Sequence, residues 1–272
     1  MPTKPGTYHR PESIDEALQL LSKPDSVALA GGTKLLASES GLAVDHVVDL
    51  QALSLSQIAD EGHTLTIGST CTLADLDAFL VQDYAAHPAG LLIREAIKRE
   101  GPNTYRNAAT LGGTIASRLP DSELLAALLV MDARISFAAQ TFSEDVELAN
   151  YLSAENPTTG LIVSVTIPWQ AGQGAAERVA RTPADYPIVS VTAWQPSGGE
   201  TRLAATGVSA RPQRLANAEA AAAGGLSDET ISLAASAARD SAVHPGDFRG
   251  DAIYRAEMVE VLTRRVLEKL AK

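Results

Sequence analysis

The chain has 272 residues, of which 45% are hydrophobic and 20% charged, and it carries a formal net charge of −11. This length predicts one large domain or two unequal ones. The acidic balance, without a cluster of lysine and arginine, excludes a nucleic-acid footprint and a polybasic membrane-binding segment. No apolar run approaches the length that spans a bilayer, and the first residues lack the apolar core of a signal peptide. We therefore expect a cytoplasmic protein without membrane insertion.

The cysteine and histidine content argues against a metal centre on this chain. Cys71 is the single cysteine, and the five histidines show no metal-ligand spacing. One cysteine cannot form an internal disulfide, and an iron–sulfur cluster takes about four cysteine ligands. We interpret Cys71 as a small buried hydrophobic residue and expect no bound metal.

Apolar periodicity and turn residues predict an α+β chain, with strands and helices grouped apart rather than strictly alternating. The expected strands cover residues 27–30, 46–50, 64–69, 133–137, 161–167, 177–181, 188–194 and 201–208. The expected helices cover residues 11–22, 34–37, 72–80, 89–98, 120–131, 212–223, 227–239 and 251–271. The helix over 120–131 is apolar nearly all round after its first turn, so it should be buried.

A glycine-rich stretch at residues 170–174 predicts a linker or a hairpin loop. We place the domain boundary there. The first domain covers residues 1–170, with a boundary between two subdomains near 55–60. The second covers residues 175–272 and combines a three-stranded antiparallel sheet with three helices.

Two segments about eighty positions apart share a Gly-Gly-Thr centre, at Gly31-Gly32-Thr33 and Gly112-Gly113-Thr114. Each is expected to form a tight turn, because glycine tolerates positive φ and lets a bulky ligand approach the backbone. Successive N–H groups in such a turn can form a concave anion site. Together, the two turns could hold the two phosphates of a dinucleotide from opposite sides.

An ordered set of motifs along almost the whole chain resembles the flavoprotein (medium) subunits of molybdenum hydroxylases. This family includes the FAD subunits of carbon monoxide dehydrogenase and xanthine dehydrogenase. The most specific motif is the segment that ends in the second glycine pair. The motifs are Tyr8 to Leu18, Ala30 to Leu36, Ile67 to Leu76, Arg106 to Gly113, Pro120 to Ala133 and His244 to Arg255. The resemblance implies a two-lobed, PCMH-like FAD-binding domain followed by a small C-terminal domain.

The resemblance also implies that both glycine segments contact the FAD pyrophosphate. The implied contacts are Ala30, Gly31, Gly32, Thr33, Lys34 and Leu35 in the first segment and Thr110, Gly112, Gly113 and Thr114 in the second. In this interpretation backbone amides neutralise the phosphates, and threonine hydroxyls add further donors. The alternative is that both segments are only tight turns after strands.

Three further contacts are implied outside the glycine segments. Glu123 stands where the family has an FAD-contacting aspartate, Ile162 where it has an aliphatic residue covering the flavin, and Arg181 lies in a turn of the second domain. An arginine near the flavin would stabilise its reduced, anionic form. Each has an alternative: Glu123 as an ordinary helix N-terminal acid, Ile162 as plain core, and Arg181 as a partner of Asp185.

The chain leaves the family pattern just after the second glycine pair. Thr114 stands where the family usually has asparagine, and Arg118-Leu119 replace a small-residue step before Pro120.

The implied function is that of an FAD-carrying electron-transfer subunit. In the family, a large molybdopterin subunit oxidises the substrate, and two [2Fe–2S] clusters in a small subunit pass electrons to FAD. FAD then reduces NAD, oxygen or a quinone. We expect a heterotrimer, dimerised, with those other centres on partner chains. The alternatives are a flavin-free scaffold subunit of the same type of complex and a stand-alone flavin oxidoreductase.

Overall fold

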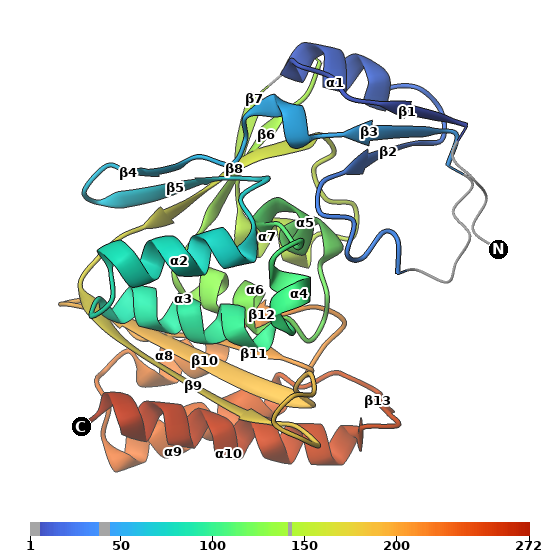
Figure 1. Cartoon of the computed structure of the whole chain (residues 1–272). Coiled ribbons are helices and arrows are strands. Elements are labelled where there is room, and N and C mark those ends of the chain that lie inside the picture. Colours follow the sequence, from blue (N-terminus) through green and yellow to red (C-terminus); the bar gives the residue numbers. More distant parts are fainter. Residues whose placement is uncertain (1–5, 38–43, 141–142) are drawn as a thin grey trace.

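The computed structural model describes residues 6–37, 44–140 and 143–272. Its helices and strands form successive layers, with an N-terminal lobe at one end and the last three helices at the other (Figure 1). Within these ranges, no helix combines the length and apolar character that crossing a membrane requires.

The N-terminal lobe contains a parallel sheet of order β1-β3-β2, covered by one helix. Its elements are β1 (Thr7–His9), α1 (Ile14–Leu21), β2 (Ser26–Leu29), β3 (His46–Asp49) and the 3-10 helix η1 (Gln51–Leu53). Apolar residues of α1, β3 and η1 form a small core with Leu161, which lies much later in the sequence. The lobe is therefore attached to the rest of the molecule through its own core.

The second lobe contains an antiparallel sheet of order β4-β5-β8-β6-β7, with helices packed below it in Figure 1. The strands are β4 (Ile58–Asp60), β5 (Thr64–Gly68), β6 (Arg134–Ala138), β7 (Ser143–Glu147) and β8 (Leu161–Pro168). The helices are α2 (Leu73–Asp83), α3 (Pro88–Arg99), α4 (Asn103–Arg106), α5 (Leu111–Ser117), α6 (Glu123–Val130) and α7 (Leu148–Ser153). Every residue of α6 is buried, as its continuous apolar sequence predicts.

The C-terminal part contains a second antiparallel sheet, of order β12-β11-β10-β9, between two layers of helices. Helices α3 and α6 contact one side of it, and α10 contacts β9 and β10 from the other. Its elements are β9 (Gly172–Val179), β10 (Val189–Pro196), β11 (Arg202–Thr206), β12 (Gln213–Arg214), α8 (Ala216–Ala222), α9 (Asp228–Asp240), a hairpin β13 (Gly246–Asp247) and β14 (Gly250–Asp251), and α10 (Ala252–Leu270). The α+β class is thus confirmed.

Several local predictions need correction. Residues 34–37 form hydrogen-bonded turns rather than a helix, and the strand expected at 177–181 begins at Gly172, inside the expected linker. The short β12 adds a fourth strand to the predicted three-stranded sheet. The short elements β4, β7, α4 and α7 were missed because none carries a long apolar pattern. The proposed domain limits themselves stay a prediction.

The largest correction concerns the second Gly-Gly-Thr segment, which is not a turn after a strand. It forms the first turns of α5, and Thr110 is the N-cap, whose hydroxyl accepts a hydrogen bond from the N–H of Gly113. The signal was present in the sequence, because threonine three residues before that amide is a typical N-cap. The two glycines that follow have low helix propensity, and they favoured the prediction of a turn over that of a helix.

Candidate functional site

A cavity of about 850 Å³ lies between the N-terminal lobe and the second lobe. Its lining includes both Gly-Gly-Thr segments together with the strand that leads into the first and the loop that leads into β8. The volume is in the range that holds a drug-sized or cofactor-sized ligand. The predicted site residues in the lining are Ala30, Gly31, Gly32, Thr33, Lys34, Leu35, Thr110, Gly112, Gly113, Thr114 and Ile162.

The first glycine segment is a turn that packs on Ala108 and Ala109, the residues just before the second segment. A Cβ added to Gly31 would overlap the carbonyl oxygen of Ala108, so a side chain at this position is excluded. Gly32 has a φ of +67°, the left-handed conformation that glycine adopts readily. The N–H groups of Gly31 to Leu35 have no hydrogen-bond partner in the described part of the chain. This turn therefore presents free donors at the wall of the cavity.

The second glycine segment offers a different surface, because protein acceptors already occupy its amides. Leu111 donates to the carbonyl of Cys71 and Gly112 to the carbonyl of Ser69, each at 2.9 Å. The N–H and hydroxyl of Thr114 both donate to the carbonyl of Thr110, at 2.9 and 3.0 Å. What remains for a ligand is the positive end of a short helix and the open face of Gly113, where an added Cβ would meet only the Thr110 hydroxyl.

Lys34 is the single charged side chain among the described residues that line the cavity. Its ammonium lies 5.2 Å from the ring centre of Tyr105 and 5.3 Å from that of Tyr186. It also donates a long hydrogen bond, of 3.4 Å, to the Tyr186 hydroxyl. Two aromatic faces thus hold the cation weakly, within reach of an anion in the cavity.

Sequence reasoning missed several residues of the lining. Ser69 lies under Gly112, and its buried hydroxyl has no partner among the described residues. A buried hydroxyl without a partner is costly, so this one is suited to a ligand atom. Tyr105, Ser117 and the loop of residues 156–160 also face the cavity. Ser69 lies inside the family motif Ile67 to Leu76, but no local sequence pattern indicates that its hydroxyl faces a ligand.

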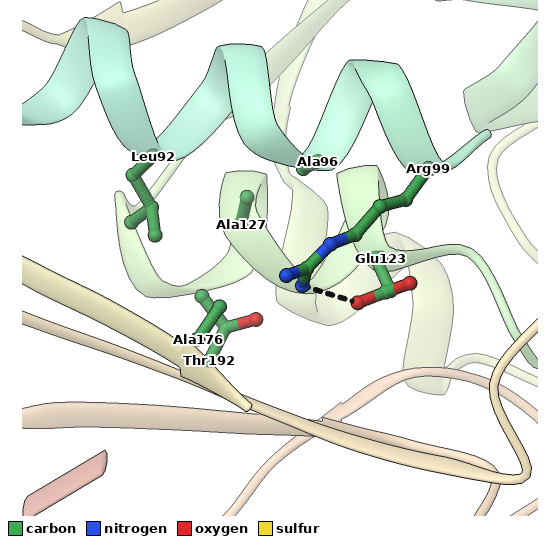
Figure 2. A pocket seen from close by; sticks show the side chains of 7 residues that line it. All are labelled: Leu92, Ala96, Arg99, Glu123, Ala127, Ala176 and Thr192. Atoms are coloured by element: carbon green, nitrogen blue, oxygen red, sulfur yellow. Dashed lines mark hydrogen bonds and ion pairs between the residues drawn. The ribbon is translucent and has the colours of Figure 1, made fainter. Parts of the chain in front are cut away.

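The structure places Glu123 outside this lining. Its carboxylate forms ion pairs with Arg99, at 2.9 Å, and with Arg178 of β9, at 3.3 Å. Burial raises its pKa, and the two arginines oppose that rise. Figure 2 shows the ion pair of Glu123 and Arg99 at a small pocket that Ala176 and Thr192 also line. In this geometry Glu123 connects α3 and α6 to the C-terminal sheet.

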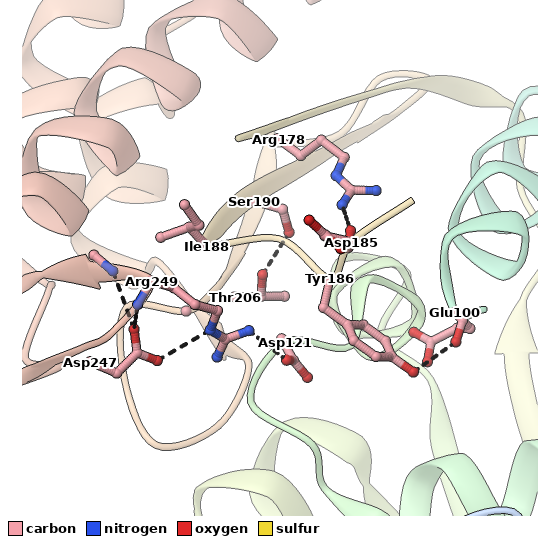
Figure 3. A network of polar contacts seen from close by, with 12 residues as sticks. Glu100, Asp121, Arg178, Asp185, Tyr186, Ile188, Ser190, Thr206, Asp247 and Arg249 are labelled. Carbon is pink, nitrogen blue, oxygen red and sulfur yellow. Dashed lines mark hydrogen bonds and ion pairs between the residues drawn. The ribbon is translucent and has the colours of Figure 1, made fainter. Parts of the chain in front are cut away.

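Arg181 lies on an exposed turn and is likewise absent from the cavity lining. The alternative pairing with Asp185 does not form among the described residues. Instead Arg178 donates to the backbone carbonyl of Asp185, as Figure 3 shows. Neither proposed role of Arg181 corresponds to a contact in this geometry.

The departure at Arg118 has a structural explanation. Its guanidinium donates to the carbonyls of Tyr151 and Leu152, at 2.9 and 2.8 Å, and to that of Ala154. Arg211, from the C-terminal part, also donates to Leu152, at 3.1 Å. Two cations thus stabilise the carboxyl end of α7, where the helix dipole is negative. Arg118 therefore binds the end of α7 and does not line the cavity, whereas its neighbour Leu119 does.

Comparison with known proteins identifies the family. Residues 3–170 match the model of the FAD binding domain in molybdopterin dehydrogenase, and residues 176–270 match the CO dehydrogenase flavoprotein C-terminal domain. The chain belongs to this flavoprotein family. The family recognised from the sequence motifs is therefore confirmed, and an FAD-binding domain is present.

Two relatives and one solved structure match over almost their full length. The glyceraldehyde dehydrogenase medium chain of Sulfolobus acidocaldarius is 28% identical over 97% of this chain and 98% of its own. The carbon monoxide dehydrogenase medium chain of Hydrogenophaga pseudoflava is 27% identical over 96% and 95%. A solved structure of carbon monoxide dehydrogenase from the same organism superposes with a TM-score of 0.89 at 27% identity, covering 99% and 98%. These relatives are chains of dehydrogenases.

The residues of the cavity fit the phosphates of FAD. A turn with free amides, the orphaned hydroxyl of Ser69 and one lysine converge on a wall kept open by glycine. Donors of this kind suit a phosphate anion. The remaining lining is mostly apolar or small, as the bulk of a large planar cofactor requires.

Proposed function

We propose that this chain carries FAD in the cavity between its two N-terminal lobes and passes electrons as one subunit of a molybdenum hydroxylase complex. The observation that carries the proposal is that both Gly-Gly-Thr segments line one 850 Å³ cavity, with the first packed on the residues that lead into the second. The family membership supports the cofactor, and the near-complete match to medium chains supports the place of the chain in a larger complex.

The chain's own residues bind and orient the cofactor. The amides of residues 31–35 and the hydroxyls of Ser69 and Thr110 would hold the pyrophosphate, and Lys34 would supply a positive charge. Ile162, at the β8 wall of the cavity, is placed to cover a planar ring. Bound FAD supplies the redox chemistry, taking up and releasing electrons one or two at a time. The described lining contains no carboxylate or histidine, so its side chains serve binding rather than acid–base chemistry.

The partners follow from the same proposal. A small subunit with two [2Fe–2S] clusters would deliver electrons, and a large molybdopterin subunit would oxidise the substrate. The three chains would form a heterotrimer that dimerises. The final acceptor would be NAD, oxygen or a quinone.

Titration of the purified apoprotein with FAD, followed by flavin absorbance and fluorescence, tests the binding step. We expect saturation at one FAD per chain. A folded protein that takes up no FAD would refute the proposal and favour a flavin-free scaffold. Reduction of the bound flavin by the reduced iron–sulfur partner tests the transfer step. Substrate turnover by the chain alone would favour a stand-alone oxidoreductase.

A further inference from the structure

A buried carboxyl group lies beside the cavity and plays no part in the binding site described above. Glu100 follows α3, and its side chain is 1% exposed. One carboxyl oxygen accepts hydrogen bonds from the Ser122 hydroxyl, at 2.6 Å, and from the N–H of Leu124, at 3.0 Å. The other oxygen, Oε2, is buried and has no partner among the described residues. The group is thus only half satisfied as a carboxylate, which favours its protonated form.

Tyr186 connects this residue to the cavity. Its hydroxyl donates to the backbone carbonyl of Glu100 at 3.0 Å and accepts from the ammonium of Lys34 at 3.4 Å. Figure 3 shows the tyrosine ring extending from the C-terminal part toward Glu100. The tyrosine thus contacts the ammonium of Lys34 and the backbone of Glu100, so it places the cation that lines the cavity near the residue whose carboxyl is buried.

Lys34 is the cation that lowers the pKa of the Glu100 carboxyl, with a smaller effect than burial and the two hydrogen bonds to that group. From α6, the neighbouring Glu123 disfavours the charged carboxylate, but its own charge is compensated by Arg99 and Arg178. Tyr105 and Tyr186 face Glu100 from α4 and from the loop before β10, and burial raises both of their pKa values. Burial raises the pKa of Glu100 to about 7. The hydrogen bonds from Ser122 and Leu124 oppose that rise most, and the positive charge of Lys34 opposes it to a smaller extent.

We propose, on the basis of the function proposed above, that Lys34, Tyr186 and Glu100 act as one unit that couples occupancy of the cavity to protonation. A phosphate anion bound at the first glycine turn draws the Lys34 ammonium away from Glu100, and the Glu100 carboxylate then takes up one proton from solvent. Lys34 is suited to this movement because it is held by two ring faces and one long hydrogen bond, without an ion-pair partner among the described residues.

The coupling has a definite sign. Loss of a nearby positive charge raises the carboxyl pKa, so the FAD complex binds more protons than the apoprotein. The dissociation constant for FAD should then rise with pH, by at most about tenfold per pH unit. The rise begins near the apoprotein pKa of about 7 and ends at the higher pKa of the complex. Well below pH 7, Glu100 is already protonated in the apoprotein, so its titration should not change the dissociation constant for FAD with pH.

The first experiment measures the link within the apoprotein. The Glu100 pKa is followed by carboxyl infrared or ¹³C NMR titration in the wild type and in Lys34→Met, with Lys23→Met as the matched control at an exposed lysine. We expect a higher Glu100 pKa in Lys34→Met and no change in Lys23→Met. Equal pKa values in all three proteins would overturn the coupling.

The second experiment measures proton uptake on FAD binding, by calorimetry near pH 7 in two buffers of different ionisation enthalpy. Because Glu100, with a pKa of about 7, is already half protonated at pH 7, we expect uptake of at most about half a proton per FAD there. The same uptake is expected in Glu144→Gln, a control at an exposed glutamate. Uptake should disappear in Glu100→Gln and in Lys34→Met. FAD binding with the same proton count in Glu100→Gln as in wild type overturns the coupling and leaves the proposed function standing. Failure of FAD to bind overturns the proposed function, and the apoprotein titration then decides the coupling alone.

Discussion

The two Gly-Gly-Thr segments share a sequence but differ in structure, and the difference separates two ways of building a phosphate site. The first is a turn with a residue at φ +67° and with free amides. The second is the start of a capped helix whose first four amides are already bonded within the protein. The first segment can thus offer direct hydrogen bonds. The second offers a helix end, a hydroxyl and an uncrowded surface.

The glycines also serve different purposes within each pair. Gly31 and Gly112 are packing residues, because an added Cβ would strike the Ala108 carbonyl in one case and lie 2.7 Å from the Ser69 Cβ in the other. Gly32 is needed for its backbone conformation. Gly113 alone faces space that a ligand could use. A side chain introduced at each of these positions should therefore disturb a different property: packing, backbone conformation or ligand binding.

The largest effect is expected for Gly31→Val. The new side chain would overlap the Ala108 backbone, so the first glycine turn would be forced away from the loop that leads into α5, at a cost of about 3 kcal/mol or more. Thermal unfolding should show a lower melting temperature together with loss of FAD binding. Gly224→Ala, where an added Cβ meets nothing within 4 Å, is the control and should unfold like the wild type.

Gly113→Val should separate binding from folding. The Cβ of the valine would meet only the Thr110 hydroxyl, and the side chain would occupy ligand space, so we expect FAD binding to weaken by at least tenfold, about 1.4 kcal/mol. The free energy of unfolding should fall by no more than about 1 kcal/mol. Flavin fluorescence titration and urea unfolding measure the two quantities. Unchanged FAD affinity would show that the helix end does not face the cofactor.

Lys34→Met should weaken FAD binding by roughly tenfold or more, because hydrogen bonds to charged groups contribute about 1.5–3 kcal/mol. The effect should shrink with added salt, since the charge of Lys34 acts at the wall of an open cavity. Affinity measured at two salt concentrations tests this. A loss that does not depend on salt would indicate packing of the lysine stem instead.

The smallest effect is expected for Thr110→Ala. Loss of the N-cap should lower the free energy of unfolding by about 1 kcal/mol. FAD affinity should fall by less than tenfold, because the released Gly113 amide replaces part of the lost hydroxyl contact. Thr72→Ala removes the equivalent cap of α2, outside the cavity lining, and should lower stability without changing FAD affinity. A large affinity loss in Thr110→Ala would assign the main phosphate contact to its hydroxyl.

The comparison also shows where sequence reasoning succeeded. Long apolar patterns predicted α6 and the helix at the end of the chain, since burial of a continuous face leaves a local periodic signal. The ordered motifs predicted the family and the α+β class. Among the predicted site residues, Lys34 and Ile162 line the cavity, whereas Glu123 and Arg181 lie outside that lining. Their roles as FAD contacts stay a prediction. Sequence alone could not distinguish the two roles considered for Glu123, because an acid in the first turn of a helix has the same local pattern whether it contacts a ligand or pairs with arginines.

By itself, the sequence determined which segments are special: two glycine pairs, one buried helix and an ordered set of family motifs. Only the tertiary structure decided what each does. Whether a glycine serves packing, conformation or ligand access depends on the atom opposite its missing side chain, and that atom belongs to a distant segment. Whether an amide is free depends likewise on acceptors such as Cys71 and Ser69, which lie about forty positions from the amides that use them. Such contacts leave no local pattern, because they arise only when separate parts of the chain are packed together.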